Sequence, residues 1–511
     1  METLAIVIVV IYAVSLLFIF SYSIIQLNLA ITYLKAKAAG KKKEDLPAAF
    51  LTAFPAVTVQ LPVYNELYVI ERLIDAVVQL NYPKAKLHIQ VLDDSTDETT
   101  ALISRKVAAL QSAGFDIVHL QRPIRKGYKA GALAYGLVSA KGEFIAVFDA
   151  DFVPAPEFLM QTLPSFSDLK TGVVQTRWEH LNKQHSLITM LQAFGLDAHF
   201  SIEQAGRNAA GHFINFNGTA GVWRKKCIDD AGGWQSDTLT EDLDLSYRAQ
   251  VRGWKFIYRE DIGTPAELPV AMNALKNQQF RWNKGAAECV RKNLGTILQK
   301  RGLPFSTKLH AVFHLMNSTI FIFIMATAIL SIPMLFIKDQ FPQFSNVFIY
   351  ASFFLVSFLI LGFFYFISQS QQDKKFPLNL WKFLLTFPLF LSVSMGLALH
   401  NAIAVLQGYF GMKSAFIRTP KFNVQEGQKS WRHNKYLEKS INWMTLAEGM
   451  LALYFTAGIV IAFVLKDYGL LPFHLMLAFG FGFVCYYSFA HSKPTTAKSP
   501  NYRWKFRMAR S

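Results

Sequence analysis

The sequence predicts an α/β domain with a mostly parallel sheet, inserted into a membrane domain of several helical spans. Long apolar runs fill the first 34 residues and about the last 200, whereas the stretch from about 50 to 300 has ordinary globular composition. Within that stretch, strand-like and helix-like patterns alternate, which is typical of parallel sheets. Apolar residues make up 52% of the chain and 45 residues are Phe, which excludes an ordinary soluble enzyme.

The N-terminal run from Leu4 to Ala30 is almost entirely apolar and long enough to cross a bilayer. Glu2 precedes it and the basic segment LKAKAAGKKK (34–43) follows it, a pattern typical of a retained anchor and not of a cleaved signal peptide. By the positive-inside rule this lysine cluster places the following domain in the cytoplasm. We therefore expect an integral, multi-pass protein of the plasma or inner membrane.

Further apolar runs predict spans at about 311–337, 346–368, 444–465 and 470–491. The segment 377–411 is also apolar, but as a simple span it would place the basic loop after it outside, against the charge rule. We expect this segment to lie in the interface or to re-enter, so that the exact number of spans here stays open. The expected divisions are an N-terminal transmembrane anchor (1–34), a cytoplasmic domain (50–305), a transmembrane hairpin (306–376), an interfacial or re-entrant segment with a loop (377–440), a second hairpin (441–492) and a basic cytoplasmic tail (493–511).

The formal net charge of +17 is largely explained by these basic flanks, although an anionic substrate would also suit it. The basic residues flank spans and do not gather on one face, which argues against nucleic-acid binding. The three cysteines, Cys227, Cys289 and Cys485, lie far apart and form neither a disulfide framework nor a CxxC metal site.

Four strands are expected in the central domain, separated by a helix at about 67–80, a helix that ends at about 113 and a helix at 129–140. The strands begin the segments AVTVQLPVYNE (56–66), LHIQVLDDSTD (87–97), FDIVHL (115–120) and GEFIAVFDADFVP (142–154). In such sheets ligands bind at the carboxyl ends of the strands. The absence of a Gly-rich Walker loop argues against a P-loop ATPase.

Two pairs of acids fall at those strand ends. Asp93 and Asp94 end the second strand, and Asp149 and Asp151 end the fourth. A single pair is equally typical of a turn or a helix cap, but two pairs on one ligand-binding edge favour a functional site. Carboxylates with this spacing suit Mg²⁺ or Mn²⁺, which bind through one or two carboxylates and phosphate oxygens. A nucleotide-sugar diphosphate needs such a cation because its leaving group gathers negative charge.

Two later segments carry further chemistry. Thr240-Glu241-Asp242 stands at an expected helix start, with Thr240 as the expected cap, and an acid there can act as general base toward an acceptor hydroxyl. In NQQFRWNKG (277–285), Arg281 suits phosphate oxygens and Trp282 offers an indole face to a sugar ring. Helix capping, a surface arginine and a core tryptophan are the alternatives for these residues.

Together these motifs resemble the processive family 2 glycosyltransferases, inverting enzymes that include the cellulose, mannan and hyaluronan synthases. The family pattern D, DxD, TED and Q(Q/R)xRW is present in order as Asp93, 149–151, 240–242 and 278–282. The segments LPVYNE, GYKAGAL, FNGTAGVWR and TEDLDLSYR are most similar to cellulose synthase-like glucan and glucomannan synthases. The resemblance covers about residues 50–440 and implies a nucleotide-diphospho-sugar transferase fold for the central domain.

The resemblance also implies a role for each matching residue. Asp242 is the implied catalytic base, and Asp149 and Asp151 are the implied metal and diphosphate ligands. The implied nucleotide-sugar contacts are Tyr64, Glu66, Asp93, Lys129, Asp149, Gln278, Arg281, Thr419 and Lys421. The implied acceptor contacts are Trp282, Asn217, Gly218, Thr219 and Glu241. The family's cellulose synthases commonly carry Cys where this chain has Asn217, which speaks against strict cellulose synthesis.

The segment FIRTPKFNV (416–424) resembles the gating loop that closes over the donor in cellulose synthases, and its cytoplasmic placement agrees with the charge rule. Because only a short basic tail follows His491, we expect no regulatory domain for cyclic dinucleotides in this chain. Accessory subunits stay unknown.

The expected function is polymerisation of a β-linked polysaccharide from a nucleotide sugar, UDP-glucose or GDP-mannose, with translocation of the product across the bilayer. A β-glucan is the first expectation, and a mannan or glucomannan is close behind. A lipid glycosyltransferase similar to ceramide glucosyltransferases, which adds a single sugar, is the nearest alternative. A transporter or nucleotide-binding membrane module is a second alternative, against which Asp242 and Trp282 speak.

Overall fold

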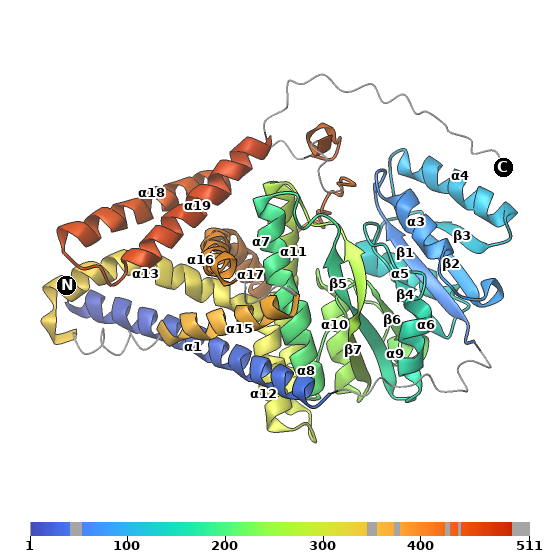
Figure 1. Cartoon of the computed structure of the whole chain (residues 1–511), viewed down its shortest axis with the longest axis horizontal. Coiled ribbons are helices and arrows are strands. Elements are labelled where there is room, and N and C mark those ends of the chain that lie inside the picture. Colours follow the sequence, from blue (N-terminus) through green and yellow to red (C-terminus); the bar gives the residue numbers. More distant parts are fainter. Residues whose placement is uncertain are drawn as a thin grey trace.

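The computed structural model describes residues 2–40, 54–344, 355–372, 379–424, 430–437 and 441–492. An α/β part occupies one end of the molecule, and long helices extend from it to the other end (Figure 1). The start of the expected span at 346–368, the basic tail 493–511, and parts of the basic segments at 34–43 and 413–439 lie outside the described residues.

A seven-stranded mixed sheet with the order β3-β2-β1-β4-β6-β5-β7 forms the centre of the α/β part. Its strands are β1 (Val57–Val63), β2 (Leu87–Asp93), β3 (Asp116–Gln121), β4 (Phe144–Val147), β5 (Thr171–His180), β6 (Gly221–Arg224) and β7 (Lys255–Ala266). The first four strands pair in parallel, β6 is antiparallel to both β4 and β5, and β5 pairs with β7 in parallel. The predicted mostly parallel sheet is confirmed, with all four expected strands in place.

Both faces of this sheet are buried. Successive strand residues point to opposite sides of the sheet, and each side packs in its own cluster of apolar residues. In β4, Ala146 packs in the cluster that holds α3 (Ile70–Val78), whereas Ile145 and Val147 pack in the cluster on the other face. The other helices of this part are α4 (Thr99–Ser112), α5 (Tyr128–Val138), α6 (Phe158–Thr162), α9 (Lys225–Asp230) and α10 (Glu241–Val251).

Further helices connect the sheet to the long apolar helices, which we call the membrane part. They are α7 (Leu187–Ala198), a π-helical segment (His199–Gln204), α8 (Ala205–Ala209), α11 (Met272–Gln299) and α12 (Phe305–Leu315). The long apolar helices are α1 (Glu2–Ala38), α13 (Ile320–Gln340), α15 (Leu355–Gln372), α16 (Leu380–Gly396), α17 (Ala398–Tyr409), α18 (Trp443–Val464) and α19 (Leu471–Ser492). Short 3-10 turns lie at Lys84–Lys86, Leu163–Phe166, Asn317–Thr319, Pro342–Phe344 and Ser430–His433.

Four helical segments among the described residues are long and apolar enough to cross a membrane. They are α1, Asn317–Gln340, α18 and α19. The consecutive helices α16 and α17 would count as a fifth span, but they meet at an angle of 49°. Such a bend suits the interfacial or re-entrant geometry expected for this segment.

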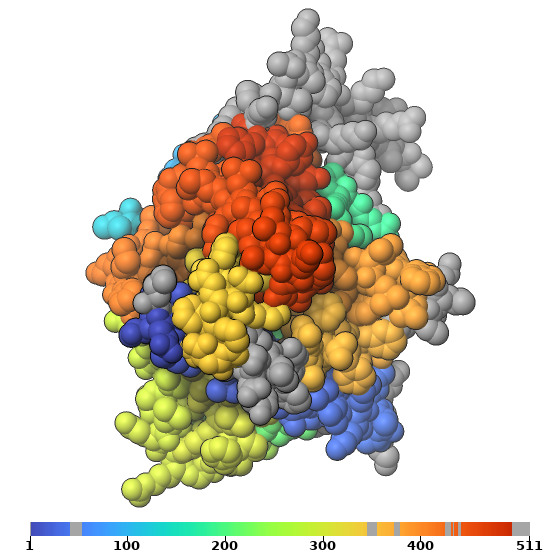
Figure 2. Space-filling view, turned by 90° about the vertical axis from the view of Figure 1, so that its left-hand side faces the viewer, coloured from blue at the N-terminus to red at the C-terminus, as the bar shows by residue number. Residues whose placement is uncertain are grey.

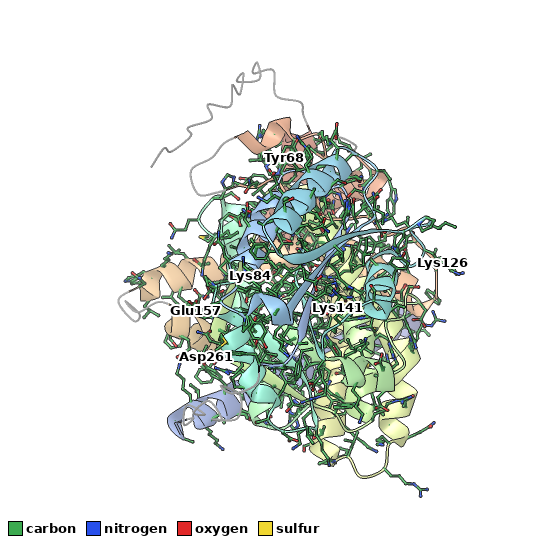
Figure 3. The ribbon with its side chains drawn as sticks, turned by 90° about the vertical axis from the view of Figure 1, so that its right-hand side faces the viewer. Tyr68, Lys84, Lys126, Lys141, Glu157 and Asp261 are labelled. Atoms are coloured by element: carbon green, nitrogen blue, oxygen red, sulfur yellow. The ribbon has the colours of Figure 1, made fainter. Side chains whose placement is uncertain are left out.

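The two ends of the molecule differ in surface chemistry. One end is covered by α18 and α19, in red, and α13, in yellow (Figure 2), and these helices expose large apolar side chains such as Leu453 and Phe463. At the opposite end, charged side chains including Lys84, Lys141 and Glu157 stand on the surface of the α/β part (Figure 3). This segregation is the one required of a protein embedded at one end in a bilayer.

Candidate active site

A cavity with a volume of about 190 Å³ lies at the carboxyl ends of β1, β2 and β4. These neighbouring strands are parallel, so the loops that follow them meet at one edge, as the sequence predicted. The walls include most of the predicted site residues: Tyr64, Glu66, Lys129, Asp149, Asp151, Asn217, Gly218, Glu241, Asp242, Gln278, Arg281, Trp282, Thr419 and Lys421.

Two predicted residues do not line this cavity. The side chain of Asp93 is buried, its Oδ2 lies 2.9 Å from Nε2 of His119, and its Oδ1 accepts a hydrogen bond from the Ser95 amide. The wall position belongs to the next residue, Asp94. Thr219 is also buried, and its Oγ1 accepts a 2.8 Å hydrogen bond from the backbone amide of Asp149. The structure therefore places Asp93 and Thr219 behind the wall, where Thr219 holds the backbone of the wall residue Asp149.

The carboxylates of Asp149 and Asp151 each bind a lysine. Lys129 Nζ lies 2.5 Å from Asp149 Oδ1 and donates to the Gly218 carbonyl at 2.9 Å. Lys421 Nζ lies 2.7 Å from Asp151 Oδ2. Burial alone would lower the pKa of Lys129, but the nearby carboxylates, Asp149 first, raise it, so this side chain stays cationic.

Asp242 lies at the first turn of α10 and faces the cavity. Burial, together with the neighbouring Glu241 carboxylate, raises the pKa of Asp242 to about 7, while Lys129 opposes the shift. Gly218, with a φ of 81°, comes close to this carboxylate: a Cβ at that position would lie 3.0 Å from Asp242 Oδ2. A titratable acid with a pKa near neutrality in a cavity is suited to general base catalysis.

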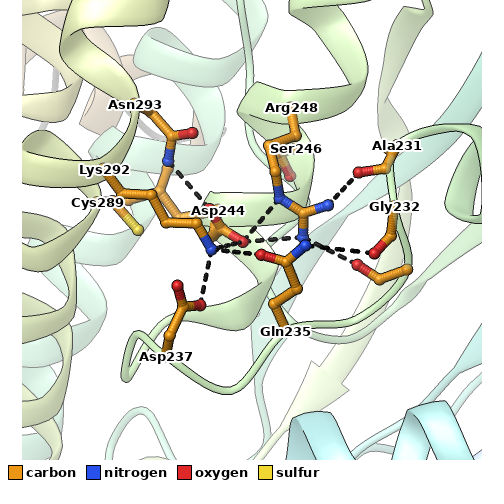
Figure 4. A network of polar contacts seen from close by, with 12 residues as sticks. Ala231, Gly232, Gln235, Asp237, Asp244, Ser246, Arg248, Cys289, Lys292 and Asn293 are labelled. Carbon is orange, nitrogen blue, oxygen red and sulfur yellow. Dashed lines mark hydrogen bonds and ion pairs between the residues drawn. The ribbon is translucent and has the colours of Figure 1, made fainter.

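A polar network behind the cavity fixes α10 against α11 (Figure 4). The buried carboxylate of Asp244 accepts hydrogen bonds from Arg248, Lys292 and Asn293, so it joins the helix that carries Asp242 to the helix that carries Trp282. Removal of one partner of such a buried network leaves uncompensated charge, which is strongly destabilising.

The start of α10 was predicted correctly, but the predicted cap was wrong. Thr240 makes no side-chain capping hydrogen bond, and its Oγ1 instead lies 3.4 Å from Sγ of Cys289 on α11. The close approach of α11 explains this, since a Cβ on Gly285 would lie only 2.5 Å from Cγ2 of Thr240. Contact between the two helices therefore takes the place of the cap.

The loop after α17 folds over the cavity. Arg281 donates a 2.8 Å hydrogen bond to Thr419, and Arg418 lies 3.0 Å from Glu66. Burial raises the pKa of Glu66 to about 8, although Arg418 and Lys421 oppose this shift. The loop residues Phe416, Arg418, Thr419 and Lys421 line the cavity, so the segment that resembles a gating loop lies at the predicted place.

A second cavity, of about 490 Å³, shares Asp242, Trp282, Gln278 and Asn217 with the first. It continues between helices of the membrane part, where its apolar walls include Phe321 of α13, Phe364 of α15 and Phe390 of α16. The two cavities meet at the predicted base and the predicted sugar-stacking residue.

Comparison with known proteins places the chain in a family. Residues 55–285 match the family described as "Glycosyltransferase like family 2". "Probable glucomannan 4-beta-mannosyltransferase 6" of Oryza sativa subsp. japonica is 35% identical over 396 residues, which are 75% of this chain and 66% of that protein. "Glucomannan 4-beta-mannosyltransferase 7" of Arabidopsis thaliana is 40% identical over 266 residues, 51% of this chain and 48% of that protein.

The chain belongs to glycosyltransferase family 2. This confirms the family that the motifs predicted. The chain spans about half the length of most of the curated relatives it matches. Among solved structures, a mannosyltransferase from Pyrobaculum calidifontis, in complex with GDP-Man and Mn²⁺, has a TM-score of 0.52 with 18% identity and covers 80% of this chain and 100% of its own. That likeness shows a shared fold.

In this family 2 glycosyltransferase, the donor atoms around Asp149 and Asp151 fit a hard divalent cation. Each carboxylate uses one oxygen on a lysine, Asp149 on Lys129 and Asp151 on Lys421, which leaves the other oxygen of each for further binding. No group of three or more His, Cys, Asp or Glu side chains arranged to hold a metal occurs among the described residues. Two carboxylates and no more are what such a cation needs when phosphate oxygens and water complete its shell.

Sequence reasoning missed four acidic or basic wall residues of this glycosyltransferase. Asp94 was noted only as a strand end, and Arg125, Arg418 and Glu267 were not singled out, although all four line the first cavity. The guanidinium carbon of Arg125 lies 3.4 Å from the ring centroid of Tyr64, so it covers the face of a predicted nucleoside contact. Two of these residues could have been found from their positions in the sequence, because each is close to a predicted site residue. Arg125 stands four residues before Lys129, and Arg418 directly precedes Thr419.

Proposed function

We propose that this chain is a membrane-embedded, inverting hexosyltransferase that extends a β-linked mannan or glucomannan from a nucleotide sugar. The observation that carries the proposal is the meeting of the two cavities at Asp242 and Trp282. One cavity offers cations and carboxylates for a nucleotide diphosphate, and the other offers an aromatic and apolar path toward the membrane helices. A polymerase needs this arrangement because its product must leave from the point at which it grows.

The proposed reaction is a single displacement. Asp242 accepts the proton of the acceptor hydroxyl, whose oxygen attacks the anomeric carbon of the donor as the bond to the nucleoside diphosphate breaks. Arg281 and Lys421 face the cavity as cations and stabilise the charge that gathers on the departing diphosphate. Asp149 and Asp151 would hold a Mg²⁺ or Mn²⁺ ion, which when bound neutralises part of that charge.

Trp282 would stack under the terminal acceptor sugar, since it lines both cavities beside Asp242. Lys129, held between Asp149 and the Gly218 carbonyl, would reach the donor. Gln278 lines both cavities and would contact the diphosphate from α11.

The printed names of the relatives favour a mannosyl donor over the β-glucan expected first from the sequence. Several are called glucomannan 4-beta-mannosyltransferases, and they are 40 to 43% identical over about half of this chain. GDP-mannose is therefore the proposed first donor, with UDP-glucose as a co-substrate if the product is a glucomannan.

The size of the product separates this proposal from a lipid glycosyltransferase. Membranes containing the chain, incubated with radiolabelled GDP-mannose, should form a long polymer that a β-mannanase digests. Parallel membranes given UDP-glucose alone should form no product that this enzyme digests. Membranes with Asp242→Asn serve as the control for endogenous synthases. A single labelled glycolipid that resists the mannanase would show that the chain adds one sugar to a lipid.

The pH dependence of transfer should follow Asp242. Because its pKa is raised to about 7, the carboxylate is protonated and inactive as a base below that pH. We expect kcat/KM to rise about tenfold per pH unit below neutrality and to level off above about pH 7. A rate that is flat between pH 5 and 8, with donor binding unchanged, would contradict the assignment of Asp242 as base.

A further inference from the structure

A cluster of polar side chains, three of them buried, lies on the wall of the second cavity beside the predicted residue Asn217. It consists of Tyr22 and Gln26 of α1 and of His199 and Glu203 of the π-helical segment, and we name it the Glu203 cluster. All four residues line the cavity. Sequence reasoning took α1 as an anchor and gave none of these residues a role.

The hydrogen bonds of the Glu203 cluster run toward its carboxylate from two sides. Gln26 Nε2 donates to Glu203 Oε1 at 2.6 Å, and His199 Nδ1 lies 2.8 Å from Glu203 Oε2. On the far side of His199, its Nε2 lies 3.3 Å from Nδ2 of Asn217. With the Asn217 amide as donor, His199 is the neutral tautomer that carries its proton on Nδ1. The cluster therefore links α1 to the loop that carries Gly218.

Glu203 stays ionised in this setting. Burial would raise its pKa, but Arg207 and His199 outweigh that and lower the pKa to about 2. Nη1 of Arg207 lies 3.6 Å from Oε2 of Glu203. A permanent carboxylate on a cavity wall is a strong acceptor for hydroxyl groups.

The amide oxygens on the same wall point to a ligand that donates hydrogen bonds. Gln26 is 2% exposed, and its Oε1 has no protein donor among the described residues. The same holds for Oδ1 of Asn215 and of Asn401 and for Oε1 of Gln192, all from residues that line this cavity. Buried polar atoms in native proteins are normally paired. A surplus of acceptors is matched by a molecule rich in hydroxyl groups.

We propose that the Glu203 cluster is a saccharide-binding subsite, which holds a hydroxyl-bearing sugar residue of the acceptor behind the one that stacks on Trp282. Gln26 and Glu203 accept hydrogen bonds from its hydroxyls, and His199 fixes the orientation of the carboxylate. The subsite rests on the proposed function for the identity of the acceptor, but its preference for a glycan over an acyl chain follows from the acceptors on the wall. In this role α1 is part of the binding site and more than an anchor.

The subsite is tested by replacing its polar atoms without changing its volume. Gln26→Met and His199→Phe each remove hydrogen-bonding atoms and keep a side chain of similar size. We expect each to weaken binding of mannohexaose by about tenfold, measured by calorimetry on the purified full chain in detergent. Gln26→Met removes about one hydrogen bond to the sugar, and His199→Phe removes the group that orients the Glu203 carboxylate. Binding of GDP-mannose to the Gln26→Met variant should stay within about twofold of the wild type, since Gln26 does not line the first cavity.

Ser21→Ala is the matched control, because Ser21 lies on the exposed side of α1 and its hydroxyl bonds only within the helix. Where one of the two variants fails to fold, as seen by thermal unfolding, the other decides. Wild-type affinity for mannohexaose in a folded variant, or tight binding of an alkyl glycoside with loss of oligosaccharide binding, would overturn the subsite.

The outcome is separate from that of the proposed function. If the wild type makes no polymer from any donor but binds mannohexaose in a manner that depends on Gln26, the proposed function fails and the subsite stands. If polymer forms and neither variant changes acceptor affinity or acceptor KM, the subsite fails and the function stands.

Discussion

Replacement of Asp242 by Asn abolishes sugar transfer and leaves donor binding intact: this is the largest effect that we expect. Asn keeps the shape of the side chain but has no lone pair basic enough to take the acceptor proton. Loss of a general base typically lowers kcat by about 10²- to 10⁴-fold. Because burial and Glu241 raise the pKa of Asp242 to about 7, the wild-type side chain is only partly charged at neutral pH. The substitution therefore changes the charge of the donor site little.

The measurement is transfer of labelled sugar at saturating donor, with the donor dissociation constant measured alongside. Asp229→Asn is the control, since Asp229 is exposed and does not line either cavity. Transfer by Asp242→Asn at the rate of the control would remove Asp242 from the reaction. A parallel loss of donor binding would instead make it a binding residue.

The second large effect is expected from Gly218→Ala. A Cβ at position 218 would lie 3.0 Å from Asp242 Oδ2 and 3.5 Å from Lys129 Nζ, so the methyl group displaces the base. A misplacement of this kind can cost about 10²-fold in kcat. The positive φ of 81° adds backbone strain for any residue with a Cβ. We expect donor affinity to fall much less than kcat.

Gly114→Ala separates the two causes. Gly114 has a φ of 80°, almost the same as Gly218, but a Cβ there meets nothing within 4 Å. Both variants should lose similar unfolding free energy, about 1 kcal/mol. Only Gly218→Ala should lose turnover. Equal activity of the two variants would mean that Gly218 does not position Asp242.

The first four strands, and the sheet edge at which they end, could be predicted because both follow from local sequence patterns. Each of the first four strands has a run of apolar residues on both faces, and each is followed by a helix with its own apolar pattern. Because these strands run parallel, their carboxyl ends lie at one edge of the sheet for any conformation of the loops. For this reason Asp94, Asp149 and Asp151 meet in the structure, as expected from positions about 55 residues apart.

Local information did not decide between neighbours in a motif. Asp93 and Asp94 are adjacent acids, and the register of β2 turns Asp93 inward to His119 and Asp94 to the cavity. Thr240 has the residue type and position of a cap, but α11 contacts it through Gly285 and the cap is not formed. These choices depend on which other elements pack nearby.

The sequence by itself determined the family, the alternation of strands and helices, and the apolar character of the spans, because each follows from residues close together in the chain. Only the tertiary structure decided which side chains face the cavities and that α1 joins the wall beside Glu203. Gln26 and Glu203 are 177 residues apart, and no periodicity or motif connects them. Their contact arises because buried polar groups must find partners among whatever the packed helices place beside them.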